Sequence, residues 1–180
     1  MRIRLSFVLL TLLAGCVSTP APPPPPPPRP TPTPAPPPPP PPPAPALRGD
    51  WQDWPASPGG WVYRQDSRGS LALFGAPDTG AQFMVRCDTA AQRVYLSRAG
   101  AVAAGSAPMT IRTSAQTSSH IVRNTGGQPP YVALELTPRD PLLDRMAFSR
   151  GRFVVEVTGL PILVVPAWPE LSRVVEDCRG

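Results

Sequence analysis

The hydrophobic positions of residues 47–180 alternate with polar ones over short stretches that are separated by turn residues. In residues 82–87, for example, Phe83, Val85 and Cys87 fall on one face of an extended strand. Alternation interrupted by Gly, Pro, Asn and Asp is typical of antiparallel sheets, and it predicts about seven to nine strands. The candidates are residues 61–65, 70–74, 82–87, 93–98, 108–113, 119–123, 131–136, 152–157 and 160–165, of which 119–123 fits an edge strand.

Two stretches have helical periodicity instead. Asp140 is suited to cap a short helix that begins at Pro141 and ends before Gly151. A second helix begins near Pro169, and its apolar residues recur at i, i+3, i+4 and i+7: Leu171, Val174, Val175 and Cys178. The sequence therefore predicts a mainly β domain at residues 47–180, an antiparallel β-sandwich or barrel with a short internal helix and a C-terminal helix.

The chain starts with two arginines, an apolar run at residues 5–13 and small residues, which together form the layout of a secretory signal. The run is too short to span a bilayer, which takes roughly 20 residues. It ends in Leu13-Ala14-Gly15-Cys16, which resembles the lipobox of bacterial lipoproteins. This resemblance implies that residues 1–15 are a signal peptide, and that residues 16–19 begin the mature chain with acyl chains such as palmitate on Cys16. The alternative is that Cys16 merely ends an ordinary signal or lies in an uncleaved one.

In Gram-negative lipoproteins an aspartate just after the cysteine tends to retain the protein in the inner membrane. Here Val17 and Ser18 follow the cysteine. The resemblance therefore implies a protein anchored in the outer membrane and facing the periplasm.

Residues 20–46 contain 20 of the 31 prolines of the chain. Proline fixes φ and has no N–H to donate, so this tract is expected to be a disordered or polyproline II stalk rather than helix or sheet. At about 3.1 Å per residue such a stalk extends roughly 80 Å. The alternative, a ligand for proline-reading domains, has less support in an envelope protein.

Charge argues against nucleic acid as a partner. The chain has 17 basic and 12 acidic residues, but Arg2, Arg4 and Arg29 lie outside residues 47–180, which leaves a formal charge of +2 there. Binding of nucleic acid normally needs a clustered basic surface.

The cysteine count fits an anchored, exported protein. If Cys16 carries lipid, Cys87 and Cys178 remain, and an oxidising compartment favours their pairing. Strand and helix periodicity each turn one of them inward, so we expect a disulfide between them. The alternatives are a metal or redox site, which lack close CxxC spacing and have only the single histidine, His120. We expect no metal and no cofactor.

Arg86-Cys87 closes a predicted strand, Phe153-Val154-Val155-Glu156-Val157 and Gly159-Leu160 lie further along the chain, and Asp177-Cys178-Arg179 ends the predicted C-terminal helix. Together these stretches resemble small exported, disulfide-linked β-sandwich domains of the VasI type, a type VI secretion accessory, and of the invasion-associated locus B type. This resemblance implies a disulfide-linked β-sandwich domain in the cell envelope and a role as a secretion accessory. It supplies no catalytic residues.

Two groups of residues are candidates for binding. Trp51, Trp54 and Trp61 could stack on sugar rings, or they could seal the end of a β core. Arg150 and Arg152 could grip a carboxylate or phosphate, or simply form a basic turn before a strand.

Catalysis has little support from the residue pattern. His120 has Ser118 and Ser119 beside it, but a triad joins residues brought together by folding. Asp140 and Asp144 fit helix capping better than acid/base work. We therefore expect a non-enzymatic binding or structural protein with an envelope protein as partner; the alternatives are a glycan- or peptidoglycan-binding module, a secretion accessory and an envelope hydrolase.

Overall fold

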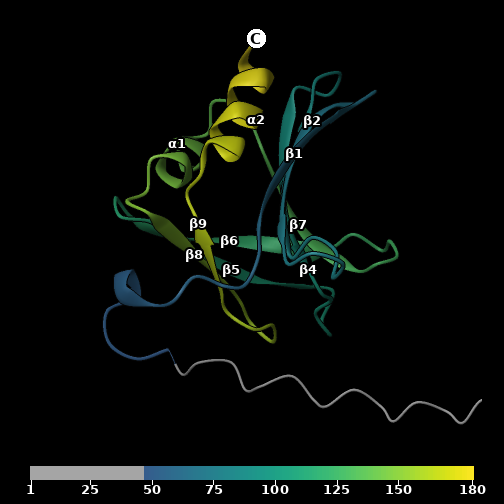
Figure 1. The fold of residues 1–180 in the computed structure, drawn as a ribbon. Coiled ribbons are helices and arrows are strands. Elements are labelled where there is room, and N and C mark those ends of the chain that lie inside the picture. Colours follow the sequence, from purple (N-terminus) through teal and green to yellow (C-terminus); the bar gives the residue numbers. More distant parts are fainter. Residues whose placement is uncertain (1–46) are drawn as a thin grey trace, which may run out of the picture. The chain divides into compact units, whose positions relative to one another are not determined.

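The computed structural model describes residues 47–180, so the signal, Cys16 and the proline tract lie outside the described residues. Nine strands form one antiparallel sheet in the order β1-β2-β3-β4-β7-β6-β5-β8-β9 (Figure 1). The prediction of a mainly β domain with two helices is confirmed. The strands are β1 (Gly60–Asp66), β2 (Gly69–Gly75), β3 (Phe83–Asp88), β4 (Arg93–Ala99), β5 (Ser106–Arg112), β6 (Thr117–Asn124), β7 (Tyr131–Leu136), β8 (Arg152–Val157) and β9 (Leu163–Pro166).

The sheet bends between β6 and β7, which pair only at Arg123 with Ala133 and at Asn124 with Val132. In Figure 1, β5 and β6 run across the view, whereas β1 and β2 run up it. The bend brings the first and last strands together, because the Trp61 indole N–H donates to the carbonyl of Pro166 at 2.8 Å. One folded-over sheet, rather than two separate sheets, therefore encloses the core.

The core consists of the inward-facing residues of both halves of the sheet. The Phe83 ring lies 6.3 Å from Trp61 and 6.0 Å from Phe153, so aromatic contacts join β1, β3 and β8 across it. These rings pack near edge-on, the arrangement that the aromatic quadrupole favours. The largest fully buried side chains also include Phe74, Leu96, Met109, Ile111, Leu143, Met146, Leu163 and Leu171.

Two helices and a single 3-10 turn complete the described part of the chain: η1 (Trp51–Asp53), α1 (Pro141–Ala147) and α2 (Pro169–Arg179). Asp140 caps α1 as predicted, because its carboxylate accepts the Leu142 N–H at 2.8 Å. The four apolar residues predicted for one face of α2 are all buried. Within residues 47–180, no helix has the length and apolar character needed to cross a membrane.

A disulfide and two polar contacts hold α2 to the sheet. Cys87 on β3 is bonded to Cys178 on α2 with 5.4 Å between their Cα atoms, which confirms the predicted bridge. The Tyr63 hydroxyl donates to Asp177 at 2.7 Å, and the Arg173 guanidinium lies 3.9 Å from the centre of the Tyr63 ring. Helix α2 is thus fixed against β1 and β3.

Most strand boundaries differ from the sequence prediction by one or two residues, and the start of β9 differs by three. β9 starts at Leu163 rather than at Leu160, because Pro161 has no N–H and Leu160 instead closes a turn by donating to the carbonyl of Val157 at 3.0 Å. β6 is longer than 119–123 and lies between β5 and β7, so the prediction of an edge strand is wrong for its C-terminal end. Its remaining residues pair with β5 alone.

Arg98 is a buried cation that joins three segments. Its side chain is on the inner face of β4, and the residue is 6% exposed. It donates to the carbonyls of Gln82 at 3.3 Å, Ala99 at 2.7 Å and Pro161 at 3.1 Å. Burial lowers the pKa of the Arg98 guanidinium from its high ordinary value.

Replacing Arg98 by leucine is expected to lower the free energy of unfolding by about 3 kcal/mol, because hydrogen bonds from a charged donor are lost and buried carbonyls are left unpaired. Urea unfolding followed by tryptophan fluorescence measures the change. The control is Arg139→Leu at an exposed position, which is expected to stay within about 0.5 kcal/mol of the parent. Equal stability of the Arg98 variant and this control would contradict the role given to Arg98.

Candidate functional site

The outward face of the first three strands has an apolar row where polar residues would be usual. Val62, Leu73 and Met84 are directly opposite one another across β1, β2 and β3. Val62 is 49% exposed, and Leu73 and Met84 are half-buried. An antiparallel sheet with one solvated face normally alternates apolar residues inward with polar residues outward. The row therefore departs from that pattern at a place open to solvent.

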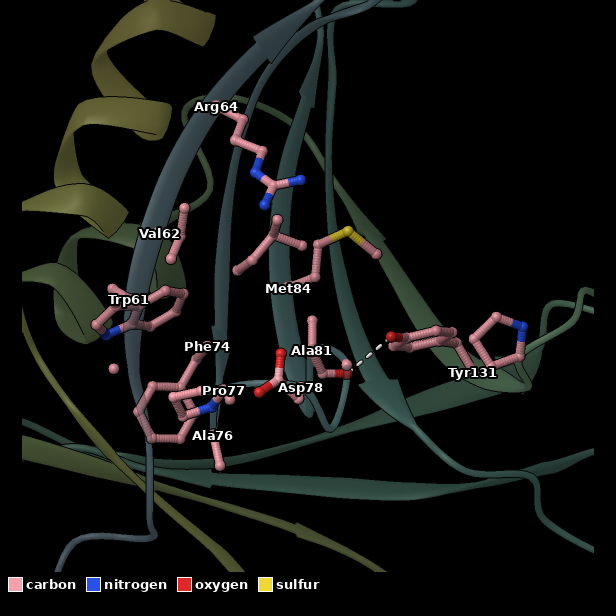
Figure 2. A pocket seen from close by; sticks show the side chains of 15 residues that line it. Trp61, Val62, Arg64, Phe74, Ala76, Pro77, Asp78, Ala81, Met84 and Tyr131 are labelled. Atoms are coloured by element: carbon pink, nitrogen blue, oxygen red, sulfur yellow. Dashed lines mark hydrogen bonds between the residues drawn. The ribbon is translucent and has the colours of Figure 1, made fainter.

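The row forms the floor of an open groove of about 640 Å³. Pro77 and Asp78, in the loop between β2 and β3, line one end of the groove, and Tyr131 on β7 lines one side, as Figure 2 shows. The Tyr131 hydroxyl donates to the carbonyl of Ala81 at 2.7 Å, which holds the tyrosine ring against the loop. The groove thus combines an aliphatic floor with an aromatic wall that is fixed in place.

At the end of the groove formed by the β2–β3 loop, the loop backbone packs closely against the end of β2. A Cβ atom on Gly75 would lie 2.5 Å from the carbonyl oxygen of Gly80. A side chain at position 75 would therefore push this loop away from the end of β2. Asp78, in the same loop, has a positive φ of 64°, a conformation that aspartate tolerates better than most residues.

Two charged residues lie on opposite sides of the floor. In Figure 2, Met84 lies between Arg64 and Asp78. Neither residue forms an ion pair among residues 47–180. In contrast, the neighbouring Asp66 pairs with Arg86 at 2.8 Å. The hydrogen bond from Arg86 is the main reason why the pKa of the Asp66 carboxyl is lowered to about 2. The charges beside the groove therefore remain available to a ligand.

The three tryptophans predicted for binding do not form one surface. Trp61 is 7% exposed and its ring packs 5.5 Å from that of Phe74, so its indole belongs to the core. Trp51 and Trp54 are half-buried on and beside η1. The Arg152 side chain donates to the carbonyl of Trp54, which ties this segment to β8. Trp61 therefore seals the core, as the alternative to sugar binding predicted. Sugar binding by Trp51 and Trp54 stays a prediction.

The two arginines predicted to bind an anion, Arg150 and Arg152, also lie in different surroundings. The Arg152 guanidinium bonds to a backbone carbonyl and is half-buried. Arg150 is exposed, and its backbone N–H donates to the Ser114 hydroxyl at 3.0 Å. Anion binding by these two arginines stays a prediction.

The candidate catalytic residues have structural partners. His120 Nε2 lies 3.1 Å from the Ser118 hydroxyl, and the histidine has no hydrogen bond to a carboxylate among the described residues. Asp140 caps α1, and Asp144 pairs with Arg179 at 2.8 Å. Residues 47–180 contain no group of three or more His, Cys, Asp or Glu side chains arranged to hold a metal ion.

Reasoning from the sequence missed the groove, although a signal was present. Residues 71–74 are apolar at four consecutive positions, so both faces of β2 had to be apolar. A run of this kind indicates a strand covered on both faces.

No protein-family model, no curated protein sequence and no solved structure matches this chain.

Proposed function

We propose that the protein is an outer-membrane lipoprotein, anchored through Cys16, that presents residues 47–180 as a non-enzymatic binding module in the periplasm. The lipobox resemblance supports the anchor. The Cys87–Cys178 disulfide fits an oxidising compartment such as the periplasm. The proline tract at residues 20–46 would hold the module away from the membrane.

The binding role rests on one observation, the outward-facing apolar row of Val62, Leu73 and Met84 in an open groove, in which Val62 is 49% exposed. Exposed apolar surface of this kind marks interaction sites, because it is stabilised when a partner excludes water from it. The floor is aliphatic, whereas sugars are normally held on aromatic faces. We therefore propose a protein partner with an apolar segment, and a component of a secretion system is one such partner.

Site-specific photocrosslinking in cells tests the groove. A photoreactive residue at Val62 is expected to give a discrete adduct with one envelope protein. The same residue at Ile162, which is 40% exposed and lies outside the groove, is the matched control and should give none. The variant Met84→Arg in the Val62-labelled chain should reduce the adduct about tenfold, because a charge is placed on the apolar floor.

The adduct itself decides between the alternatives. A peptidoglycan adduct at Val62 would favour the glycan-binding hypothesis. Equal adducts at positions 62 and 162, or no loss with Met84→Arg, would contradict a binding role for the groove. Circular dichroism of the purified Met84 variant checks that the domain still folds.

A further inference from the structure

Within residues 47–180, the bend in the sheet leaves one long strand edge without a partner. β6 pairs with β5 from Thr117, opposite Arg112, to Arg123, opposite Ser106. On its other side only Arg123 and Asn124 pair with β7. Among the described residues, no backbone hydrogen bond outside the β5 ladder reaches Thr117–Val122. The N–H and C=O groups of this stretch that point away from β5 are therefore open to a further strand.

Proteins usually protect such edges, and the two outer edges of this sheet are protected. β1 has Arg64 and Asp66 near its end. β9 is four residues long, ends in Pro166, and exchanges two 2.9 Å hydrogen bonds with Ser57 through Val164. Charges, prolines, short strands and covering loops are the devices that prevent pairing with other chains.

The free stretch of β6 has none of these devices. Thr117–Val122 contains no charged residue and no proline. Its Ile121 side chain points outward and is 61% exposed, although a charged residue would protect the edge at this position. Ile121 lines a hollow of about 450 Å³ together with Leu134 and Tyr95. An added strand could therefore form hydrogen bonds with the free N–H and C=O groups of β6 and also pack on the apolar Ile121 side chain.

The charges at the end of β6 that pairs with β7 indicate the charge that an added strand would need there. Arg123 is exposed and forms no ion pair within residues 47–180. The one carboxylate that lines the hollow, Glu135, is held by Arg93 at 2.9 Å. An acidic residue of a partner would complete the pairing of Arg123. A second copy of β6 could not supply it, because β6 has no Asp or Glu.

We propose that the free edge of β6 binds an extended segment of a partner protein by adding it to the sheet as an antiparallel strand. The segment has uncharged, strand-forming residues opposite Thr117–Val122 and an acidic residue at its N-terminal end, beside Arg123. Antiparallel pairing is slightly more stable per residue than parallel pairing, and it matches every other pair in this sheet. This surface is separate from the groove over Val62 and does not depend on the proposed function.

A synthetic peptide, acetyl-Glu-Thr-Val-Thr-Val-Thr-amide, tests the proposal against the full-length protein in detergent micelles. Binding is followed by fluorescence anisotropy of a labelled peptide and by amide hydrogen exchange. The amides of Thr117–Val122 that face away from β5 should exchange at least about tenfold more slowly with peptide present. A peptide with lysine in place of glutamate should bind about tenfold more weakly.

Three variants complete the test. Ile121→Lys should reduce binding about tenfold or more, because a charge now protects the edge. Arg123→Glu should reverse the preference, so that the lysine peptide binds better than the glutamate peptide. Ile162→Lys, at an exposed apolar residue that lines neither the groove nor the hollow beside β6, should bind the glutamate peptide like the parent.

Each other result overturns the proposal. It fails if the glutamate peptide does not slow exchange in β6, or if the two peptides bind equally well. It also fails if sedimentation shows self-association of the parent that Ile121→Lys abolishes, because the occupant would then be a second copy.

Discussion

Replacing both Cys87 and Cys178 by alanine is expected to lower the free energy of unfolding of the domain by about 4 kcal/mol. The bridge joins residues 91 positions apart, so it removes many conformations from the unfolded chain. It also ties α2 to β3, and the buried face of α2 packs on the inner side of the sheet. Without the bridge, the packing of α2 must hold the helix by itself.

Urea unfolding of the double variant, the oxidised parent and the reduced parent measures this effect. The double variant and the reduced parent are expected to unfold at similar, lower urea concentrations, since both lack the same covalent link. Glu176→Ala, at an exposed position of α2, is a control in the same helix and should change stability by less than about 0.5 kcal/mol. Equal midpoints for the oxidised and reduced parent would contradict the stabilising role of the bridge.

The bridge was predictable because both cysteines obey a local periodicity. Cys87 continues the alternation of Phe83 and Val85, and Cys178 completes the apolar face of α2. The strands were predictable for the same reason, since each buries every second residue between turn signals. These features depend on neighbours in the chain, so reading along the chain is enough to find them.

The groove and the free edge depend on contacts between distant segments. The apolar row forms because the registers of β1, β2 and β3 place Val62, Leu73 and Met84 opposite one another. The open side of β6 arises because β4 pairs with β7 rather than with β5. The apolar run at residues 71–74 indicates that both faces of β2 are apolar. Neither the register nor the strand order is contained in local periodicity, so neither site could be located from one sequence.

The tryptophan cluster shows the opposite case, in which closeness in sequence did not produce a common surface. Trp61 continues the inward face of β1, opposite Phe74, and is therefore part of the core. Trp51 and Trp54 belong to a separate 3-10 turn beside β8. The chain between Trp54 and Trp61 bends at Pro58 before β1 begins at Gly60.

The variant Cys16→Ser is expected to move the protein from the membrane fraction to the soluble periplasmic fraction, which is the largest change in behaviour that the proposed function predicts. Under the proposed function the Cys16 thiol receives lipid, and a serine hydroxyl does not take its place. Each buried methylene of an acyl chain stabilises membrane binding by about 0.8 kcal/mol, so losing the chains removes stable anchoring. Cell fractionation followed by immunoblotting measures the distribution.

Matched variants separate anchoring from folding and from sorting. Cys16→Ser should leave the Cys87–Cys178 bridge intact, as non-reducing peptide mapping would show, because the two remaining cysteines pair with each other. Val17→Asp keeps Cys16, and under the proposed function it should shift the protein toward the inner membrane instead of releasing it. Ser18→Ala should behave like the parent. If Cys16→Ser remained in the membrane fraction, a different element would have to hold the protein there, and the lipoprotein proposal would be wrong.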